Sequence, residues 1–178
     1  MHPLHLFKFC PKCGSSRFVE HNQKSKHCED CGFTYYFNPS AATVALIVNQ
    51  HGEWCVVRRG KEPAKGTLDL PGGFSDCFET SEQGVAREVL EETGLTVERV
   101  DFLFSLPNQY LYSGFLVHTI DMFYRCYVSG DTATAHAADD AAELLWLRPE
   151  DLKPEDFGLL SIRAGVAKLL ASPSPLVR

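Results

Sequence analysis

Residues 73–95 read GFSDCFETSEQGVAREVLEETGL, an acid-rich segment that predicts one amphipathic helix between two loops. Thr80 followed by Gln83 matches a capping box, which marks the start of a helix. Gly94 stands where a helix commonly ends in the left-handed backbone conformation. The predicted helix therefore runs from about Ser81 to Thr93, and the rest of the chain is interpreted around it.

The two sides of this helix carry different side chains. Successive residues of a helix are about 100° apart around its axis. One side is therefore apolar, with Val85, Ala86, Val89 and Leu90. The other side carries three glutamates beside one arginine: Glu88, Glu91, Glu92 and Arg87. Such a charged face is most often an ordinary solvated surface. Three carboxylates at this spacing repel one another, however, and one arginine offsets only part of the repulsion. A hard cation such as Mg²⁺ or Mn²⁺ relieves it, because these ions take oxygen ligands and keep waters that substrate phosphates replace.

The spacing around the helix resembles the signature of one enzyme family. From its first glycine the segment reads Gly73, five residues, Glu79, seven residues, Arg87-Glu88-Val89, one residue, Glu91-Glu92, one residue, Gly94-Leu95. Every specified position of the Nudix box is filled, so the chain resembles the Nudix hydrolases. The resemblance implies an α/β fold, the Nudix α/β/α sandwich with a mixed sheet. A mixed sheet with few helices, as the chain order indicates, is consistent with such a layered domain.

The resemblance also implies roles for single residues. The matching helix carboxylates hold catalytic divalent ions, Mg²⁺ or Mn²⁺, or position the attacking water: Glu88, Glu91 and Glu92. The position of Gly72 contributes a backbone carbonyl to a metal, and those of Glu79 and Arg87 orient the helix carboxylates. The implied reaction is attack of water on a phosphorus of a nucleoside diphosphate linked to another group, X.

One further carboxylate is expected outside the helix. In the family, an acidic residue just before a tryptophan-bearing strand completes the metal site or acts as a base. Glu143 precedes Trp146 and matches that position best, with Asp140 as the second choice. The alternative interpretation is a solvated acidic loop.

Four of the seven cysteines form two matched knuckles, Cys10-Pro-Lys-Cys13-Gly14 and Cys28-Glu-Asp-Cys31-Gly32. Each glycine permits the tight turn that brings backbone amides toward the thiolates. An odd number of cysteines without a secretory signal favours reduced thiols and a metal site over a disulfide framework. The spacing predicts one structural Cys₄ site for Zn²⁺, with iron of the rubredoxin type as the alternative.

A zinc ribbon followed by a Nudix domain resembles the NADH pyrophosphatase branch of the family. In that branch the position of Tyr36 touches substrate; an aromatic packed in the seam between two modules is the equal alternative. The branch carries a Ser-Gln-Pro-Trp-Pro-Phe-Pro-x-Ser stretch where residues 105–113 read SLPNQYLYS, without the tryptophan and two of the prolines. Tyr110, Tyr112 and Ser113 are the substrate-contact candidates in it, and the tyrosines either stack on a base or nicotinamide or pack locally.

The organisation follows from turn and boundary residues. Residues 1–38 are predicted to be the ribbon, 39–172 the Nudix domain, and 173–178 a loose tail, with Asn38-Pro39 as the boundary. An irregular segment is expected at 106–114, and the last helix at about 159–171. Arg58 and Arg59 end a predicted strand, and a basic pair there is more often solvated than bound to phosphate.

Composition limits the partners. The 178 residues are 44% hydrophobic and 22% charged, as in a globular protein with a sizeable core. The formal charge of −6 argues against sequence-independent binding of nucleic acid. No nucleic-acid partner is expected, with the exception of a nucleotide-capped RNA end. No signal peptide or membrane span is visible, so a cytoplasmic location without a membrane partner is expected. The related proteins suggest a homodimer.

The leading functional hypothesis is hydrolysis of a dinucleotide diphosphate, NAD(H) first and ADP-ribose next. Within the same enzyme class, nucleoside triphosphates, capped nucleotides and dinucleoside polyphosphates are alternatives. A nucleotide sensor that keeps the fold without turnover is a non-catalytic alternative, although no catalytic carboxylate is missing. A nucleic-acid or protein adaptor built on the ribbon is a third possibility, and the acidic balance disfavours nucleic acid.

Overall fold

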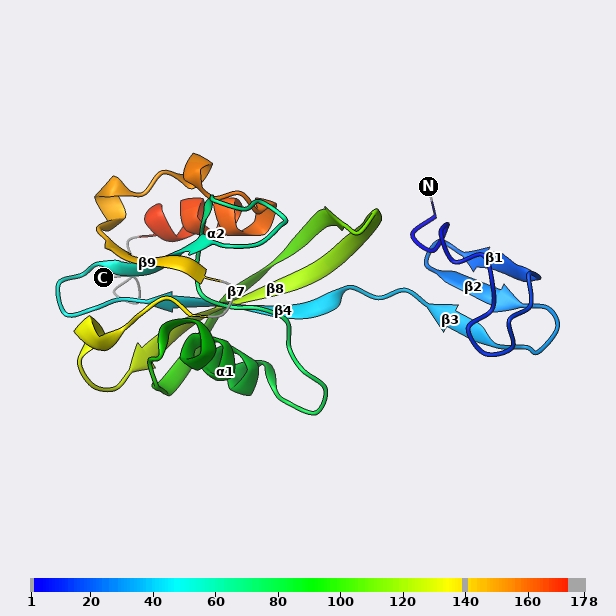
Figure 1. The fold of residues 1–178 in the computed structure, drawn as a ribbon, viewed down its shortest axis with the longest axis horizontal. Coiled ribbons are helices and arrows are strands. Elements are labelled where there is room, and N and C mark those ends of the chain that lie inside the picture. Colours follow the sequence, from blue (N-terminus) through cyan, green and yellow to red (C-terminus); the bar gives the residue numbers. More distant parts are fainter. Residues whose placement is uncertain (1, 139–140, 173–178) are drawn as a thin grey trace.

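The computed structural model describes residues 2–138 and 141–172 in two parts joined by a short extended linker (Figure 1). The N-terminal part holds the cysteine knuckles, and the larger C-terminal part holds both helices. The predicted loose tail at 173–178 lies outside the described residues, as does Asp140.

The N-terminal part is a three-stranded antiparallel sheet with very little apolar material. Its strands β1 (Phe18–Asn22), β2 (Ser25–Cys28) and β3 (Thr34–Tyr36) pair in the order β1-β2-β3. The buried cluster consists of Cys10, Phe18 and Cys28, with Cys31 and Phe33 packed against it. So few apolar side chains cannot offset the chain entropy lost on folding, and small modules of this kind are usually stapled by a metal or disulfides.

Two three-stranded sheets build the larger part. In the first, β4 (Ser40–Ile47) runs parallel to β8 (Phe115–Val128), and β8 is antiparallel to β7 (Val97–Tyr112). In the second, β6 (Leu68–Asp69), β5 (Trp54–Arg59) and β9 (Ala141–Leu147) are antiparallel in that order. The mixed strand directions of the first sheet confirm the predicted mixed sheet.

Side-chain alternation along β4 separates two apolar cores. Val44 and Leu46 belong to the core under α2 (Leu160–Leu170), which contains Ile162, Val166 and Leu169. Ala45 and Ile47 face the opposite core under α1 (Ser81–Thr93), which contains Val85 and Val89. The side chains alternate because successive residues of a strand point to opposite faces. The two helices therefore cover opposite faces, as Figure 1 shows, and the predicted α/β/α layering is confirmed.

Short 3₁₀ turns connect the remaining elements: η1 (Thr132–Thr134), η2 (Pro149–Asp151) and η3 (Pro154–Asp156). Within the described ranges, 2–138 and 141–172, no helix is long and apolar enough to cross a bilayer.

The irregular segment expected at 106–114 is wrong. Strand β7 continues to Tyr112, and a two-residue turn of Ser113 and Gly114 leads directly into β8. Both turn residues have positive φ, 50° and 74°, which suits the right-handed twist of a hairpin. The strand persists past Pro107 because its residues pair across the ladder with β8, from Leu106 opposite Asp121 down to the turn.

This long hairpin reaches the N-terminal part. Phe115, just after the turn, lies with its ring centroid 5.7 Å from that of Phe7 and 5.6 Å from that of Phe37. In Figure 1 the hairpin end and the N-terminal part are neighbours. The aromatic contact is the seam between the two parts of the molecule.

Gly165 allows α2 to approach the first sheet. A Cβ atom added there would lie 2.4 Å from the ring of Phe123, which is fully buried. We predict that Gly165→Ala lowers the free energy of unfolding by about 1–3 kcal/mol, because overpacking forces the ring or the helix to shift. Urea unfolding followed by circular dichroism measures the effect.

Ala164→Leu is the matched control, because it adds more volume at an exposed position of the same helix. It should change the free energy by no more than about 0.5 kcal/mol. Equal unfolding midpoints for both variants would contradict close packing at Gly165.

Candidate active site

The acid-bearing helix forms as predicted. Thr80 accepts a hydrogen bond from the backbone of Gln83, and the Gln83 side chain accepts one from the Thr80 backbone at 2.8 Å. At the other end, Gly94 has φ 72° and its N–H donates to the carbonyl of Leu90 at 2.9 Å. Both ends of Ser81–Thr93 are thus set by local sequence, and the predicted capping box and helix bounds are confirmed.

Arg87 is the cation at the centre of the acidic face. Its Nη2 donates to Glu79 Oε1 at 2.8 Å, and its Nη1 donates to Glu88 Oε1 at 2.8 Å and to Glu91 Oε2 at 3.0 Å. Nη2 also donates to the carbonyl of Phe74 at 3.0 Å. One guanidinium thereby ties the loop before the helix to the carboxylates on it, a geometry that lysine cannot reproduce.

The contact between Arg87 and Glu79 shifts the pKa values of both residues. The hydrogen bond from Arg87 holds the pKa of Glu79 below its ordinary value. The same hydrogen bond is the main reason that the pKa of Arg87 lies above its ordinary value. Arg87 is therefore charged at any working pH, while three carboxylates share its single positive charge.

Glu92 faces away from that arginine and is buried, with an exposed fraction of 7%. The backbone N–H of Gly72 donates to its Oε2 at 3.0 Å. Gly72 has φ 149°, and a Cβ atom there would lie 2.1 Å from the carbonyl oxygen of Thr43. At Gly73, a Cβ atom would lie 2.6 Å from Oε1 of Glu88. The lack of a side chain thus lets Gly72 lie against the backbone of β4 and lets Gly73 lie against the carboxylate of Glu88.

A cavity of about 170 Å³ opens beside these glycines. One wall consists of Gly72, Gly73 and Glu92. The rest of the lining comes from other elements and combines apolar residues with six polar ones: Asn108 and Tyr110 on β7, Thr119 and Asp121 on β8, Arg59 on β5 and Asp69 on β6. The glutamate helix therefore borders a cavity that is large enough for part of a substrate.

Arg59 corrects one expectation from the sequence. It is not simply solvated, since its Nη1 donates to Asp69 Oδ2 at 2.6 Å in the cavity wall. Burial raises the pKa of Asp69, and the guanidinium of Arg59 opposes the rise. The pair was missed because Asp69 lies in a two-residue strand, where no periodic pattern marks its direction.

Asp121, Asn108 and Thr119 were also missed. The sequence did contain one signal for this cluster. Asp121 is a charged residue two positions before the buried Phe123 on β8, so both side chains point to the core side of the strand. A single such residue has no distinctive spacing, so the sequence alone does not separate it from a surface position.

The predicted substrate contacts lie in different places. Tyr110 lines the cavity. Tyr112 and Ser113 form the hairpin end, with Tyr112 56% exposed, and Tyr36 lies exposed on β3 of the N-terminal part. Of these four residues, the structure therefore brings only Tyr110 into the cavity lining that also contains Glu92.

Glu143 lies on β9 directly opposite Arg58 of β5. Its Oε2 accepts a hydrogen bond from Arg58 Nε at 2.8 Å, and Arg58 also donates to the carbonyl of Gly66 at 3.1 Å. Glu143 is outside the cavity lining drawn from the described residues. Asp140, the second choice for the same role, lies outside the described part of the chain.

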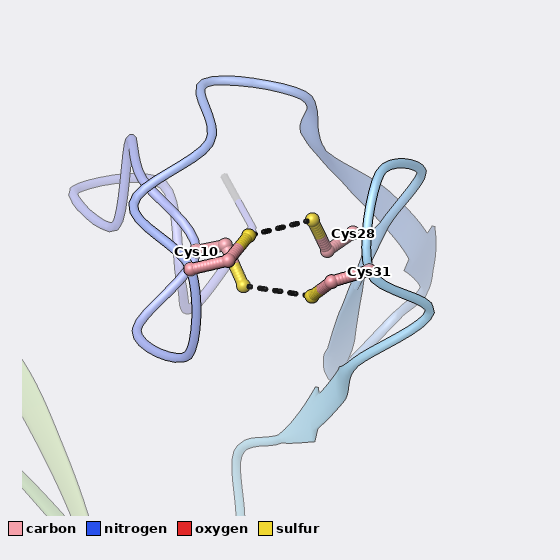
Figure 2. Close-up of side chains that lie close together, drawn as sticks. Cys10, Cys28 and Cys31 are labelled. Atoms are coloured by element: carbon pink, nitrogen blue, oxygen red, sulfur yellow. Dashed lines mark hydrogen bonds between the residues drawn. The ribbon is translucent and has the colours of Figure 1, made fainter.

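The four knuckle cysteines converge as predicted for a metal site (Figure 2). The Sγ atoms of Cys10 and Cys31 are 3.7 Å apart, those of Cys13 and Cys28 are 3.6 Å apart, and all four lie within 4.8 Å of one another. A disulfide needs about 2.05 Å, whereas a tetrahedron with metal–sulfur bonds of about 2.3 Å has edges near 3.8 Å. The donor set therefore fits one tetrahedral metal ion.

Comparison with known proteins supports the resemblance to Nudix hydrolases. Residues 38–166 match the model of the NUDIX domain. A protein of Vibrio cholerae named NAD-capped RNA hydrolase NudC is 27% identical over 153 residues, which cover 86% of this chain and 54% of that protein. A MutT-like protein of Streptomyces ambofaciens is 32% identical over 124 residues, 70% of this chain and 73% of that protein. The chain spans about half the length of the NudC proteins it matches.

A solved structure shares the whole arrangement. The crystal structure of a NUDIX hydrolase from Nitrosomonas europaea aligns with a TM-score of 0.70, covering 92% of this chain and 90% of that chain. The identity is 21%, so the likeness concerns the fold. It confirms the fold that the Nudix box implied.

The cysteine cluster predicts a pattern of thiol reactivity. Cys77 is exposed and should react with a thiol reagent at once, whereas burial raises the pKa of Cys55 and of Cys126 to about 12 and keeps both unreactive. Cys13 is also exposed, so burial does not protect it, whereas a bound metal would. We expect all four knuckle cysteines to react only after a chelator is added, as measured by mass spectrometry of the labelled protein.

Cys77→Ser is the control, and it should remove the fast reaction without affecting the chelator-dependent one. Labelling of Cys13 as fast as Cys77 in untreated protein, together with no bound metal by elemental analysis, would contradict a metal site in the ribbon.

Proposed function

The chain belongs to the NUDIX domain family, and we propose that it hydrolyses the diphosphate of a nucleoside diphosphate linked to a second group, of the NAD or ADP-ribose type. The observation that carries the proposal is the intact array on α1, where Glu88, Glu91 and Glu92 lie around Arg87 and Gly72 at the edge of a cavity. The full set of carboxylates disfavours a sensor without turnover.

The acidic face is suited to divalent cations. Arg87 balances only one of the carboxylate charges around it, and glutamate oxygens are the donors that Mg²⁺ and Mn²⁺ prefer. Glu88, Glu91 and Glu92, with the carbonyl of Gly72, are the residues that would hold them. Such ions supply charge neutralisation for the substrate phosphates and lower the pKa of water.

The protein's own side chains contribute positioning. Arg87 holds Glu88 and Glu91 in fixed orientations, and Glu79 anchors the far side of the guanidinium. The Gly72 amide fixes Glu92. Because these groups are placed before substrate arrives, little reorganisation is needed when charge develops in the transition state.

Zinc is the metal we propose for the ribbon. Four cysteine thiolates in a closed arrangement are typical of structural zinc. The buried apolar cluster is too small to keep this module folded without a metal. Metal binding would therefore contribute to the folding free energy and would have no part in catalysis.

The substrate class is supported by relatives. The similar protein of Vibrio cholerae is named an NAD-capped RNA hydrolase, which favours NAD-type diphosphates, free or at an RNA end. Residues 105–113 depart from the branch pattern that the ribbon suggests, and they form the strand and turn that carry Tyr110. Nucleoside triphosphates and dinucleoside polyphosphates are therefore included in the test.

We predict that, with Mg²⁺ or Mn²⁺ present, the compound cleaved fastest is NAD⁺, NADH or ADP-ribose. Diadenosine polyphosphates and nucleoside triphosphates should be cleaved more slowly. Glu92→Gln should lower kcat/KM by about 100-fold or more, because it removes a metal-site charge worth several kcal/mol. The amide oxygen of glutamine retains an acceptor for the Gly72 N–H. Chromatography of the nucleotide products measures the rates.

Glu82→Gln is the matched control, because it removes the same charge from an exposed position in the first turn of the same helix. It should alter kcat/KM by no more than about twofold. If no compound is cleaved, or if Glu92→Gln cleaves as fast as the parent, the proposed hydrolysis is wrong.

Glu143 is proposed as the carboxylate that contributes from outside the helix. We expect Glu143→Gln to lower kcat by about tenfold or more and to remove an ionisation from the pH profile of kcat, as loss of a base does. Glu150→Gln, at an exposed position of η2, serves as the control. An unchanged profile for Glu143→Gln would assign this residue to its ion pair with Arg58 alone.

A further inference from the structure

The end of the β7–β8 hairpin extends beyond the sheet that carries it. Strand β4 pairs with β8 only from Thr119 onward, where Ser40 lies opposite it. Residues 109–118, hereafter the arm, lie beyond that point and reach toward the ribbon (Figure 1). Within 2–138 and 141–172 no third strand pairs with them. A two-stranded hairpin is only marginally stable in water without further packing. The arm therefore needs support from outside its sheet.

Tyr110 makes the position of the arm matter for the cavity. It lies in the arm opposite Val117, and it lines the cavity. The other cavity residues of the hairpin, Asn108, Thr119 and Asp121, lie where β4 supports β8. Asn108 and Thr119 are also fixed by their hydrogen bonds to the Asp121 carboxylate. Movement of the arm would therefore displace Tyr110 from the cavity wall while the rest of the lining stays in place.

Three aromatic contacts join the arm to the ribbon. The ring centroid of Phe115, the first residue of β8, lies 5.7 Å from that of Phe7 and 5.6 Å from that of Phe37. The interplanar angles are 66° and 78°. Phe37 also contacts the ring of His118, at 5.7 Å and 82°. Pairs of this geometry are favourable beyond the area that they bury. The arm is therefore anchored at its end.

The ribbon holds its own side of these contacts in place. Lys26 of β2 is 7% exposed, and its ammonium donates to the carbonyl of Phe7 at 2.7 Å. The same ammonium lies 5.3 Å from the ring centroid of Phe18, which is buried in the cluster that contains two of the knuckle cysteines. The backbone N–H of Phe37 donates to the carbonyl of Lys24 at 2.7 Å. The folded ribbon thus fixes the backbone of both residues that contact Phe115.

We propose that the ribbon is a positioning module for the cavity: Phe7 and Phe37 clamp Phe115, and the clamped arm holds Tyr110 in the cavity wall. The assignment rests on the proposed function in taking this cavity as the substrate site. It makes Phe115 a positioning residue. The α1 carboxylates are outside the clamp, because their hydrogen bonds run to Arg87 and to the Gly72 backbone. Loss of the clamp should therefore weaken substrate binding and leave the chemical step unchanged.

Hydrogen exchange measures the arm directly, by mass spectrometry of peptides that cover residues 109–118. Phe115→Ala removes the arm side of the clamp, and Phe7→Ala removes part of the ribbon side without changing the arm. We expect arm exchange to become at least about tenfold faster in Phe115→Ala and at least about threefold faster in Phe7→Ala, because each aromatic pair stabilises the folded arm. Peptides from α1 should exchange as in the parent.

Leu111→Ala is the matched control, because it truncates an arm side chain that is 67% exposed and leaves the aromatic contacts intact. It should speed arm exchange by less than about twofold. The double variant Phe7→Ala/Phe115→Ala should exchange no faster than Phe115→Ala, since both changes remove the same contact. Unchanged arm exchange in Phe115→Ala, or fully multiplicative effects in the double variant, would overturn the proposal.

Steady-state kinetics with NAD⁺ and Mg²⁺ or Mn²⁺ separate positioning from a merely structural role. Phe115→Ala should raise KM at least about fivefold and keep kcat within about twofold, because the arm contact is lost equally in the ground state and the transition state. An unchanged KM despite faster arm exchange would reduce the clamp to a structural tie. If the arm loosens as expected but the parent cleaves none of the tested compounds, the clamp stands and the proposed hydrolysis fails.

Discussion

One guanidinium shared among three carboxylates is the interaction on which this site depends. Arg87 binds Glu79, Glu88 and Glu91 at once, and also holds the carbonyl of Phe74 in the preceding loop. It can orient these groups, but it cannot neutralise them. The negative charge that remains on this face suits it to the divalent cations proposed above, which would neutralise the charge of a diphosphate.

The rest of the fold brings backbone and cavity to that helix. The two adjacent glycines, Gly72 and Gly73, run along the free edge of β4, where the carbonyl of Gly73 accepts from the Thr43 amide at 2.8 Å. Their lack of side chains lets Gly72 lie against the β4 backbone and Gly73 lie against the carboxylate of Glu88. The cavity beside these glycines is lined by Glu92 from the helix and also by Asp121 from β8.

Local signals in the sequence predicted much of this. The capping box at Thr80, the left-handed Gly94 and the paired cysteine knuckles each depend on a few neighbouring residues, and each forms as expected. The hairpin through residues 106–114 was not predicted, because its regularity comes from pairing with β8 and only the Ser113-Gly114 turn marks it locally. The Asp121 cluster was missed for a related reason. It assembles from β7, β8 and α2, which only tertiary packing brings together.

The central claim, that the α1 carboxylates direct water to the diphosphate, is tested most directly by the products formed from NAD⁺ in ¹⁸O-labelled water with Mg²⁺ or Mn²⁺. The account predicts AMP and nicotinamide mononucleotide, with one ¹⁸O atom in the phosphate of one of them, because cleavage occurs at a phosphorus. Release of nicotinamide with intact ADP-ribose would contradict it, since that pattern places the broken bond at the ribose. Unreacted NAD⁺ would exclude NAD⁺ as the substrate of this site.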